Sequence, residues 1–217
     1  MANLFITSIP ELKKLGLPPD SSLARGLEVV TGGIQDQNSN ALFQQTWFEI
    51  LLSRGVDNFQ CYLSDVFHIL FRARPEILKS GQKISVLDVL NCSSLDEVVT
   101  MLVARKVDEL AYGGFQVIRK YLVERIAIPD ITDAEQLRLV TEAIAVRNII
   151  VHNRGHINAR FLEDTGRTDL VIGNVFAFAL NELSSYLDAI QTTSYHIDCE
   201  LVSKFGHEVF GISGTAD

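Results

Sequence analysis

Residues 132–155 read TDAEQLRLVTEAIAVRNIIVHNRG, and this stretch carries both ends of a helix together with its apolar face. Its first four residues match a capping box, in which side chains satisfy backbone donors that the first helical turn leaves without partners. Apolar residues then recur at helical spacing. Asn153 and Gly155 both accept the left-handed backbone that ends many helices. The sequence therefore predicts a helix whose last turn holds His152.

Amphipathic patterns predict further helices on both sides of this one. Apolar residues alternate steps of four and three through 40–74, and a second helix, at about 93–126, opens on two overlapping capping boxes. Gly55 is expected to bend the first helix. Gly113 and Gly114 interrupt the second at a cost of about 1 kcal/mol each relative to alanine, which predicts a close crossing by another helix. The last helix is expected to bury Leu180, Leu183, Leu187, Ile190, Ile197 and Leu201.

The connections between these helices carry turn signals. Residues 84–90 are expected to form a short extended link, and residues 160–168 a polar loop. Residues 169–177 predict a small β-hairpin about Gly173 and Asn174, because this pair tolerates the positive φ of tight turns.

These elements define an all-α fold class with a small β-hairpin insertion before the last helix. Residues 1–38 contain three prolines and a pair of glycines, which indicates an irregular N-terminal arm. Residues 39–217 are expected to form one helical domain, a size that a single hydrophobic core can support.

Composition restricts the classes of function. The formal net charge is -8 and the pI is near 5.1, so the surface as a whole repels polyanions and any RNA contact must be local. Three cysteines lack metal-ligand spacing and do not suggest a disulfide framework, which fits a reducing cytoplasm. The uncharged stretch 170–181 has 12 residues, well short of the ~18 apolar residues of a membrane span. Residues 1–14 lack the features of a secretory signal. We expect a cytoplasmic protein with no membrane partner.

The helix that ends near His152 carries groups suited to phosphodiester chemistry. RNA supplies its own nucleophile, the 2′-hydroxyl, so an enzyme must move protons and stabilise charge on phosphorus. Histidine suits the proton steps because its unperturbed pKa is about 6.5. The guanidinium of Arg147 stays charged and offers planar paired donors to phosphate oxygens.

Helical geometry sets how these groups can meet. About 100° per residue places Asn148 within about 40° of His152, whereas Arg147 lies about 140° away. Arg147 must therefore reach around its own helix or meet the histidine of a second copy. The second option predicts a homodimer in which both motifs share one cleft.

A local excess of arginine follows the same helix. Arg147, Arg154, Arg160 and Arg167 face only Glu163 and Asp164, and this basic island is where RNA would dock. The alternative is a solvated loop in which Arg147 forms a surface salt bridge and His152 caps the helix.

The residues of this region resemble the HEPN superfamily. The resemblance rests on RNIIVHNRG at 147–155, INARFL at 157–162, Gly173 and the long final helix, and it covers about 93–205. It implies a HEPN-like helical bundle and a dimeric, metal-independent ribonuclease. The implied catalytic residues are Arg147, Asn148 and His152, and the resemblance also lets Asn153 line the cleft. The other expected RNA-binding residues come from the local chemistry: Arg154 and Arg160 belong to the basic island, and His156 offers a second polar contact.

The resemblance also implies partners and a context. RNA is the expected substrate, a toxin-antitoxin or phage-defence role is expected, and an antitoxin or other regulator protein is the expected partner. We expect no cofactor and no metal, because Gly155 separates His152 from His156 and no zinc-protease glutamate accompanies them. Two alternatives stay open: a noncatalytic HEPN-like module that binds nucleotide, RNA or protein, and a purely structural dimer.

Overall fold

The structure is a computed structural model that describes residues 37–78, 84–206 and 209. The chain divides into two compact units, Met1–Phe48 and Glu49–Asp217. Apart from its last two positions, the arm expected at 1–38 lies outside the described residues. Of the first unit, the described residues include only the start of a helix, and all the candidate site residues belong to the second unit.

The described residues form helices and no strand, which confirms the all-α fold class. None of these helices combines the length and the apolar character that a membrane crossing requires. In chain order the elements are α3 (Gln37–Ala73), the 3₁₀ helix η1 (Pro75–Leu78), α4 (Val86–Leu90), α5 (Leu95–Glu124), α6 (Ala134–Asn153), α7 (Ala159–Thr165) and α8 (Leu180–Phe205).

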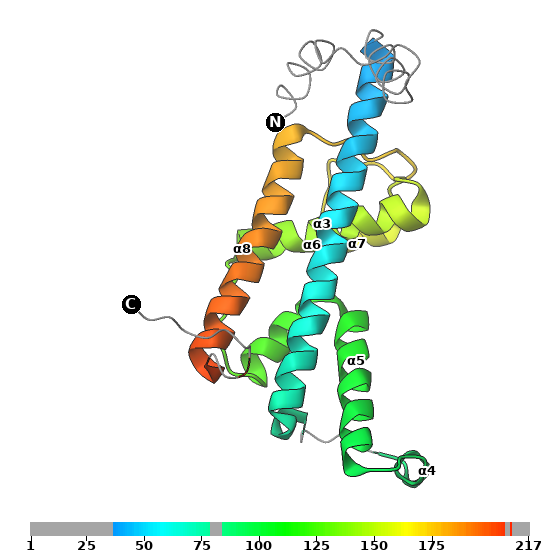
Figure 1. Ribbon diagram of the computed structural model, residues 1–217. Coiled ribbons are helices and arrows are strands. Elements are labelled where there is room, and N and C mark those ends of the chain that lie inside the picture. The colour runs from blue at the N-terminus through cyan, green and yellow to red at the C-terminus, as the bar shows by residue number, and fades with distance from the viewer. Residues whose placement is uncertain (1–36, 79–83, 207–208, 210–217) are drawn as a thin grey trace, which may run out of the picture. The chain divides into compact units, whose positions relative to one another are not determined.

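Beyond residue 49, α3 lies beside α8, and a tyrosine joins the two helices (Figure 1). The Tyr62 hydroxyl donates to Oδ1 of Asp198 at 2.7 Å and lies 3.1 Å from the carbonyl oxygen of Ser194. The apolar stripe expected on α3 is confirmed, because each of its members is at most 7% exposed: Leu52, Val56, Phe59, Leu63, Val66 and Leu70. Burying one such side chain contributes roughly 1.5–3 kcal/mol, so this stripe anchors α3 in the core.

Helix α5 packs on α3 through aromatic rings. The Tyr121 ring meets those of Phe67 and Phe71 nearly edge to face, at centroid distances of 6.0 and 5.9 Å. Ser94 caps α5 as expected, because its Oγ accepts from the backbone N–H of Glu97. The Glu97 carboxylate returns the bond to the backbone N–H of Ser93, one residue before the N-cap that a capping box uses.

Glycine positions shape two helices differently from the expectation. The interruption of α5 is present as a kink at Gly114, where φ is 74° and ψ is 178°. The close crossing, however, lies elsewhere, because a Cβ built on Gly114 meets no atom within 4 Å. A Cβ on Gly55 would lie 2.6 Å from Cδ2 of Leu187, so α3 and α8 are in close contact there. Gly55 thus leaves room for a side chain of the neighbouring helix.

Helix α6 starts where the sequence predicts, with a different residue as its cap. Oδ1 of Asp133 accepts from the backbone N–H of Gln136 at 2.7 Å, so Asp133, and not Thr132, is the N-cap. Thr132 is buried and accepts a hydrogen bond from Arg119. In Figure 1, α6 passes behind α3 and α8, and it packs against α7 and α8.

Two connections that were expected to be irregular are helical. Residues 86–90, within the link expected at 84–90, form α4, because Ser85 caps the N–H of Asp88. Residues 159–165, which overlap most of the loop expected at 160–168, form α7, where Oδ1 of Asn158 accepts from the N–H of Phe161 at 2.8 Å. In both cases a single polar side chain before the segment supplies the cap that starts the helix.

The β-hairpin expected at 169–177 is not confirmed. A turn does form at Gly173, whose φ is 89°, but the two sides of the turn do not pair with each other as strands. The backbone of 173–176 instead pairs with that of 155–157. The turn residues therefore predicted the position of the bend correctly. They did not predict that 173–176 pairs with 155–157, because that contact depends on the tertiary structure.

The cap of α5 offers a test of local stability. Replacing Ser94 by alanine should lower the free energy of unfolding by about 1 kcal/mol, because the N–H of Glu97 loses its acceptor. Ser93→Ala is the matched control, since Ser93 contributes a backbone N–H to the box. Urea unfolding of both variants measures the difference, and equal losses would contradict the assignment of the cap.

Candidate functional site

The C-terminal end of α6 presents His152 to solvent. His152 lies in the last turn, is exposed, and makes no side-chain hydrogen bond or ion pair with any residue that the structure describes. Asn148 lies one turn earlier and is also exposed, so the two side chains share a face as predicted. The left-handed residues that end the helix are Arg154 and Gly155, with φ of 52° and 76°, whereas Asn153 is still helical.

The chain after His152 is held by backbone hydrogen bonds. The N–H of Phe176 donates to the carbonyl of Gly155 at 2.8 Å, and the N–H of Ile157 donates to the carbonyl of Asn174 at 2.9 Å. The side chain of Asn153 donates to the carbonyl of His156 at 2.6 Å. These bonds fix the direction in which the chain leaves α6, so Asn153 contributes to the local structure.

His156 is exposed, but its ring is also tied to the local backbone. Its Nδ1 lies 3.1 Å from the carbonyl oxygen of Asn153, and its backbone N–H donates to the same oxygen. One ring nitrogen therefore has a partner, and the other is available to a ligand.

Arg147 is turned toward α3 rather than toward His152. Its Nη2 lies 2.7 Å from Oδ1 of Asp57, and its Nη1 donates to Oδ1 of Asn148 at 3.3 Å. The side chains of Arg147 and Asp57 are 20% and 39% exposed. Within one chain, then, α6 aligns Asn148 with His152 and directs Arg147 to a carboxylate on another helix. Asp57 gave no signal in the sequence, because it lies between stripe residues of an amphipathic helix.

A buried carboxylate, Glu142, lies in the middle of α6 and links this helix to the chain before α8. Glu142 is 1% exposed, and its two oxygens accept from Arg138 and Arg167, each at 2.5 Å. Arg167 also donates to Glu182 on α8 and, with two nitrogens at 2.7 Å, to Asp169. An ionised carboxylate is costly to bury unless it is paired and hydrogen-bonded, and here both conditions are met.

The charges in this cluster perturb its titratable groups. Hydrogen bonds from Arg167 lower the pKa of Asp169 to about 2. Burial, with the nearby charges of Glu142 and Glu182, raises the pKa of Tyr186. A sequence signal for the cluster did exist, because Glu142 falls on the apolar face of α6 one turn before the buried Val146.

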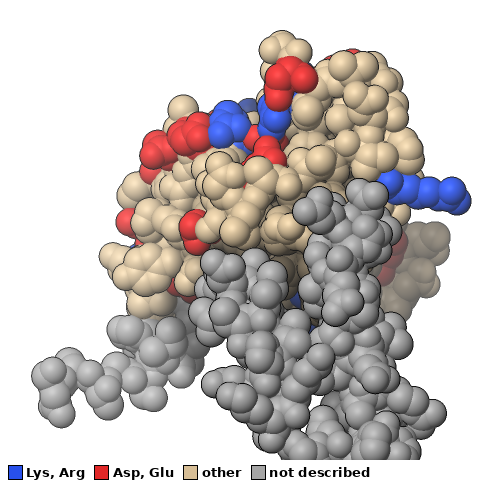
Figure 2. Space-filling model, turned by 90° about the horizontal axis from the view of Figure 1, so that it is seen from above, with Lys and Arg blue, Asp and Glu red and all other residues tan. Residues whose placement is uncertain are grey.

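The basic island expected at 147–167 is largely neutralised by carboxylates. Arg147 contacts Asp57, Arg160 lies 3.5 Å from Asp164, and Arg167 is part of the Glu142 cluster. Arg154 forms no ion pair with the described residues and is exposed. On the visible described part of the face in Figure 2, blue side chains mostly lie beside red ones and form no continuous basic surface. Among the four arginines of this island, only Arg154 is therefore without an ion pair in the described part of the chain, and the other three must open theirs to contact RNA.

Arg154 occupies a backbone conformation that favours glycine. The left-handed region costs a residue with a side chain about 1–2 kcal/mol. Two exposed groups at the end of α6, the imidazole of His152 and the guanidinium of Arg154, are thus two residues apart, and the second is kept at some cost in stability.

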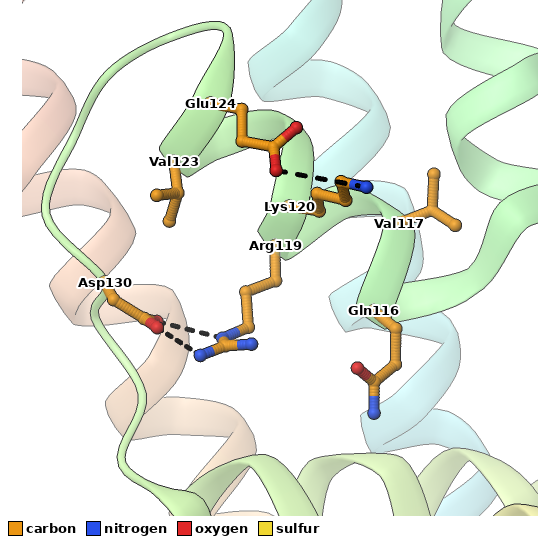
Figure 3. A pocket seen from close by; sticks show the side chains of 7 residues that line it. All are labelled: Gln116, Val117, Arg119, Lys120, Val123, Glu124 and Asp130. Carbon is orange, nitrogen blue, oxygen red and sulfur yellow. Dashed lines mark hydrogen bonds and ion pairs between the residues drawn. The ribbon is translucent and has the colours of Figure 1, made fainter.

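Two open depressions of the described surface have linings that do not include His152. One, of about 380 Å³, is lined by Gln116, Val117, Arg119, Lys120, Val123, Glu124 and Asp130 (Figure 3). Its cations are already paired, Arg119 with Asp130 and Lys120 with Glu124. A second, of about 540 Å³, follows the α3–α8 groove beside Tyr62 and Asp65. No group of three or more potential metal ligands gathers among the described residues.

No protein-family model, no curated protein and no solved structure matches this chain. The chemistry of the end of α6 therefore has to be argued from the residues themselves.

We expect that removing the buried charge of Glu142 destabilises the protein more than removing an exposed carboxylate that pairs with the same arginine. Glu142→Gln should lower the free energy of unfolding by about 3 kcal/mol, because an amide N–H then faces a guanidinium in a buried site. Glu135→Gln is the matched control: Glu135 pairs with the same Arg138 but is 65% exposed, and its loss should cost less than about 1 kcal/mol. Urea unfolding at neutral pH separates the two, and similar losses would contradict the role assigned to burial.

Backbone strain at Arg154 can be measured in the same way. Arg154→Gly should raise the free energy of unfolding by about 1 kcal/mol, because glycine adopts positive φ without steric cost. Arg160→Gly removes the same charge from a helical position and should lower it by about 1 kcal/mol. A loss of stability in Arg154→Gly would show that its side chain makes a compensating contact.

Proposed function

We propose that this protein is a HEPN-like, metal-independent endoribonuclease that acts as a homodimer. The observation that carries the proposal is the exposed imidazole of His152, unpaired among the described residues, in the last turn of α6. Asn148 shares its face one turn earlier, and Arg147 and Arg154 lie on the same stretch of chain. The resemblance of residues 147–155 to the HEPN motif supports the same assignment.

The proposed reaction is a transesterification within RNA. The 2′-oxygen attacks the adjacent phosphorus as its proton passes to a base, and the bond from phosphorus to the 5′-oxygen breaks as an acid protonates that oxygen. The products are a 2′,3′-cyclic phosphate and a 5′-hydroxyl. His152 serves as the acid-base group, because an imidazole titrates near neutrality. Arg147 stabilises charge on the phosphate, and Asn148 orients the histidine or the substrate.

In the proposed dimer, two copies of the chain bring together an arginine and a histidine that a single helix keeps apart. Asn148 and His152 share a face of α6, whereas Arg147 points toward α3. In an isologous dimer, both motifs face one cleft, so the histidine of one copy meets the arginine of the other. Two histidines can then divide the acid and base roles. Asn153, Arg154, His156 and Arg160 contact the RNA on either side of the scissile bond.

The biological context rests on the resemblance. A cytoplasmic RNase of this type fits a toxin-antitoxin or phage-defence system. An antitoxin or other regulator protein would then hold its activity in check.

A cleavage assay tests the proposal. Purified protein incubated with mixed RNA in excess chelator should produce fragments that end in a 2′,3′-cyclic phosphate. His152→Ala should lower the cleavage rate at least about 100-fold, because general acid-base catalysis contributes about 10²- to 10⁴-fold. His68→Ala, an exposed histidine on α3, is the matched control and should cleave as the wild type does. Intact RNA at several ionic strengths, or full activity of His152→Ala, would refute the enzyme.

A noncatalytic module that binds RNA, nucleotide or protein is the second candidate. It is favoured by the Arg147–Asp57 ion pair, which gives Arg147 a purely structural role. This candidate predicts that RNA binds with a salt-dependent affinity and stays intact. A filter-binding measurement on the same RNA, run beside the cleavage assay, distinguishes the two functions.

A further inference from the structure

Asp57 forms an ion pair with Arg147, the residue that binds the RNA phosphate in the proposed function. Oδ1 of Asp57 lies 2.7 Å from Nη2 of Arg147. This oxygen is buried and accepts no aligned hydrogen bond in the structure, even at that distance. The contact is therefore a pairing of charges without good hydrogen-bond geometry.

The rest of the guanidinium is incompletely used. Nη1 of Arg147 donates to Asn148 at 3.3 Å, a long bond to a neutral acceptor. Nε is buried and has no hydrogen-bond partner among the described residues. Arginine recognises phosphate through paired, nearly parallel N–H donors, so an unpartnered Nε leaves part of that recognition surface unsatisfied. The carboxylate of Asp57 therefore pairs in charge with one nitrogen of a group that can serve two oxygens.

A carboxylate in this place also repels other anions. A phosphate that approaches Arg147 meets the negative charge of Asp57 at close range, in a half-buried setting where screening by water is weaker than at the surface. Asp57 and the phosphate therefore compete for one cation.

We propose that Asp57 is an internal competitor that lowers the affinity of Arg147 for phosphate. The carboxylate occupies the anion position of Arg147 in the free protein and must be displaced before an RNA phosphate can bind there. The inference rests on the proposed function, since it gives Arg147 a phosphate to bind. It adds a residue on α3 that sets the affinity and holds the site in a low-affinity state.

A titration with inorganic phosphate tests this inference without any need for RNA cleavage. Asp57→Asn keeps the shape of the side chain and removes its charge. Phosphate binding is followed by the backbone amide shifts of residues 145–155 in isotopically labelled protein at constant ionic strength. Asp57→Asn should bind phosphate at least about fivefold more tightly than the wild type, which corresponds to the ~1 kcal/mol of a partly exposed ion pair.

Asp65→Asn is the matched control. Asp65 lies eight residues further along α3, about 12 Å away, and is exposed, so its replacement changes the net charge equally without touching Arg147. The double variant Asp57→Asn with Arg147→Ala should lose the gain. Asp57→Ser, checked for folding by circular dichroism, provides a second removal of the carboxylate and should bind phosphate more tightly as well.

The outcomes separate this inference from the proposed function. Equal phosphate affinity in Asp57→Asn and Asp65→Asn, or a gain that persists without Arg147, would overturn the competitor. Tighter phosphate binding by Asp57→Asn in a protein that never cuts RNA would support the competitor and refute the enzyme. RNA cleavage by the wild type with no gain in Asp57→Asn would do the opposite.

Discussion

The fold around the candidate site depends on one buried negative charge. Glu142 sits in the core of the α6 region with each oxygen bound by a different guanidinium, one from its own helix and one from the chain before α8. Removing either arginine would leave one oxygen of this buried carboxylate without its charged partner, and an uncompensated buried charge is costly to a protein interior. Through Arg167, the pairing connects α6, the segment at 166–169 and α8.

The segment between α7 and α8 positions the end of α6 through backbone hydrogen bonds. Arg167 fixes one end of the connection to α8, and the chain further along, at 173–176, pairs with 155–157 directly after the helix. The direction of α6, and with it the solvent-facing position of His152, is set from both sides. Arg147, one turn and a half earlier, is governed by a different helix through Asp57. The two motif residues are thus controlled by separate parts of the fold.

Local signals in the sequence predicted much of this architecture, and long-range partners account for what they missed. The caps at Ser94 and near Asp133, the buried stripe of α3 and the position of His152 all depend on residues within one or two turns. The crossing at Gly55, the pairing of 173–176 with 155–157 and the Asp57–Arg147 contact join residues far apart in the chain. Arginine counting at 147–167 misjudged the charge of the region, because the carboxylates that neutralise it come partly from α3, α6 and α8.

The backbone contact between Ile157 and Gly173 closes a ring of chain that contains α7. The N–H of Gly173 donates to the carbonyl of Ile157 at 2.8 Å, so residues 158–172 leave and return at nearly the same point. The side chain of Phe161 is buried in the core, whereas Arg160, Glu163 and Asp164 on the same helix are exposed. Substitutions at these three exposed positions of α7 accordingly leave in place the backbone bonds that hold the end of α6. Selection for a new binding preference beside this site could proceed there while the geometry around His152 is preserved.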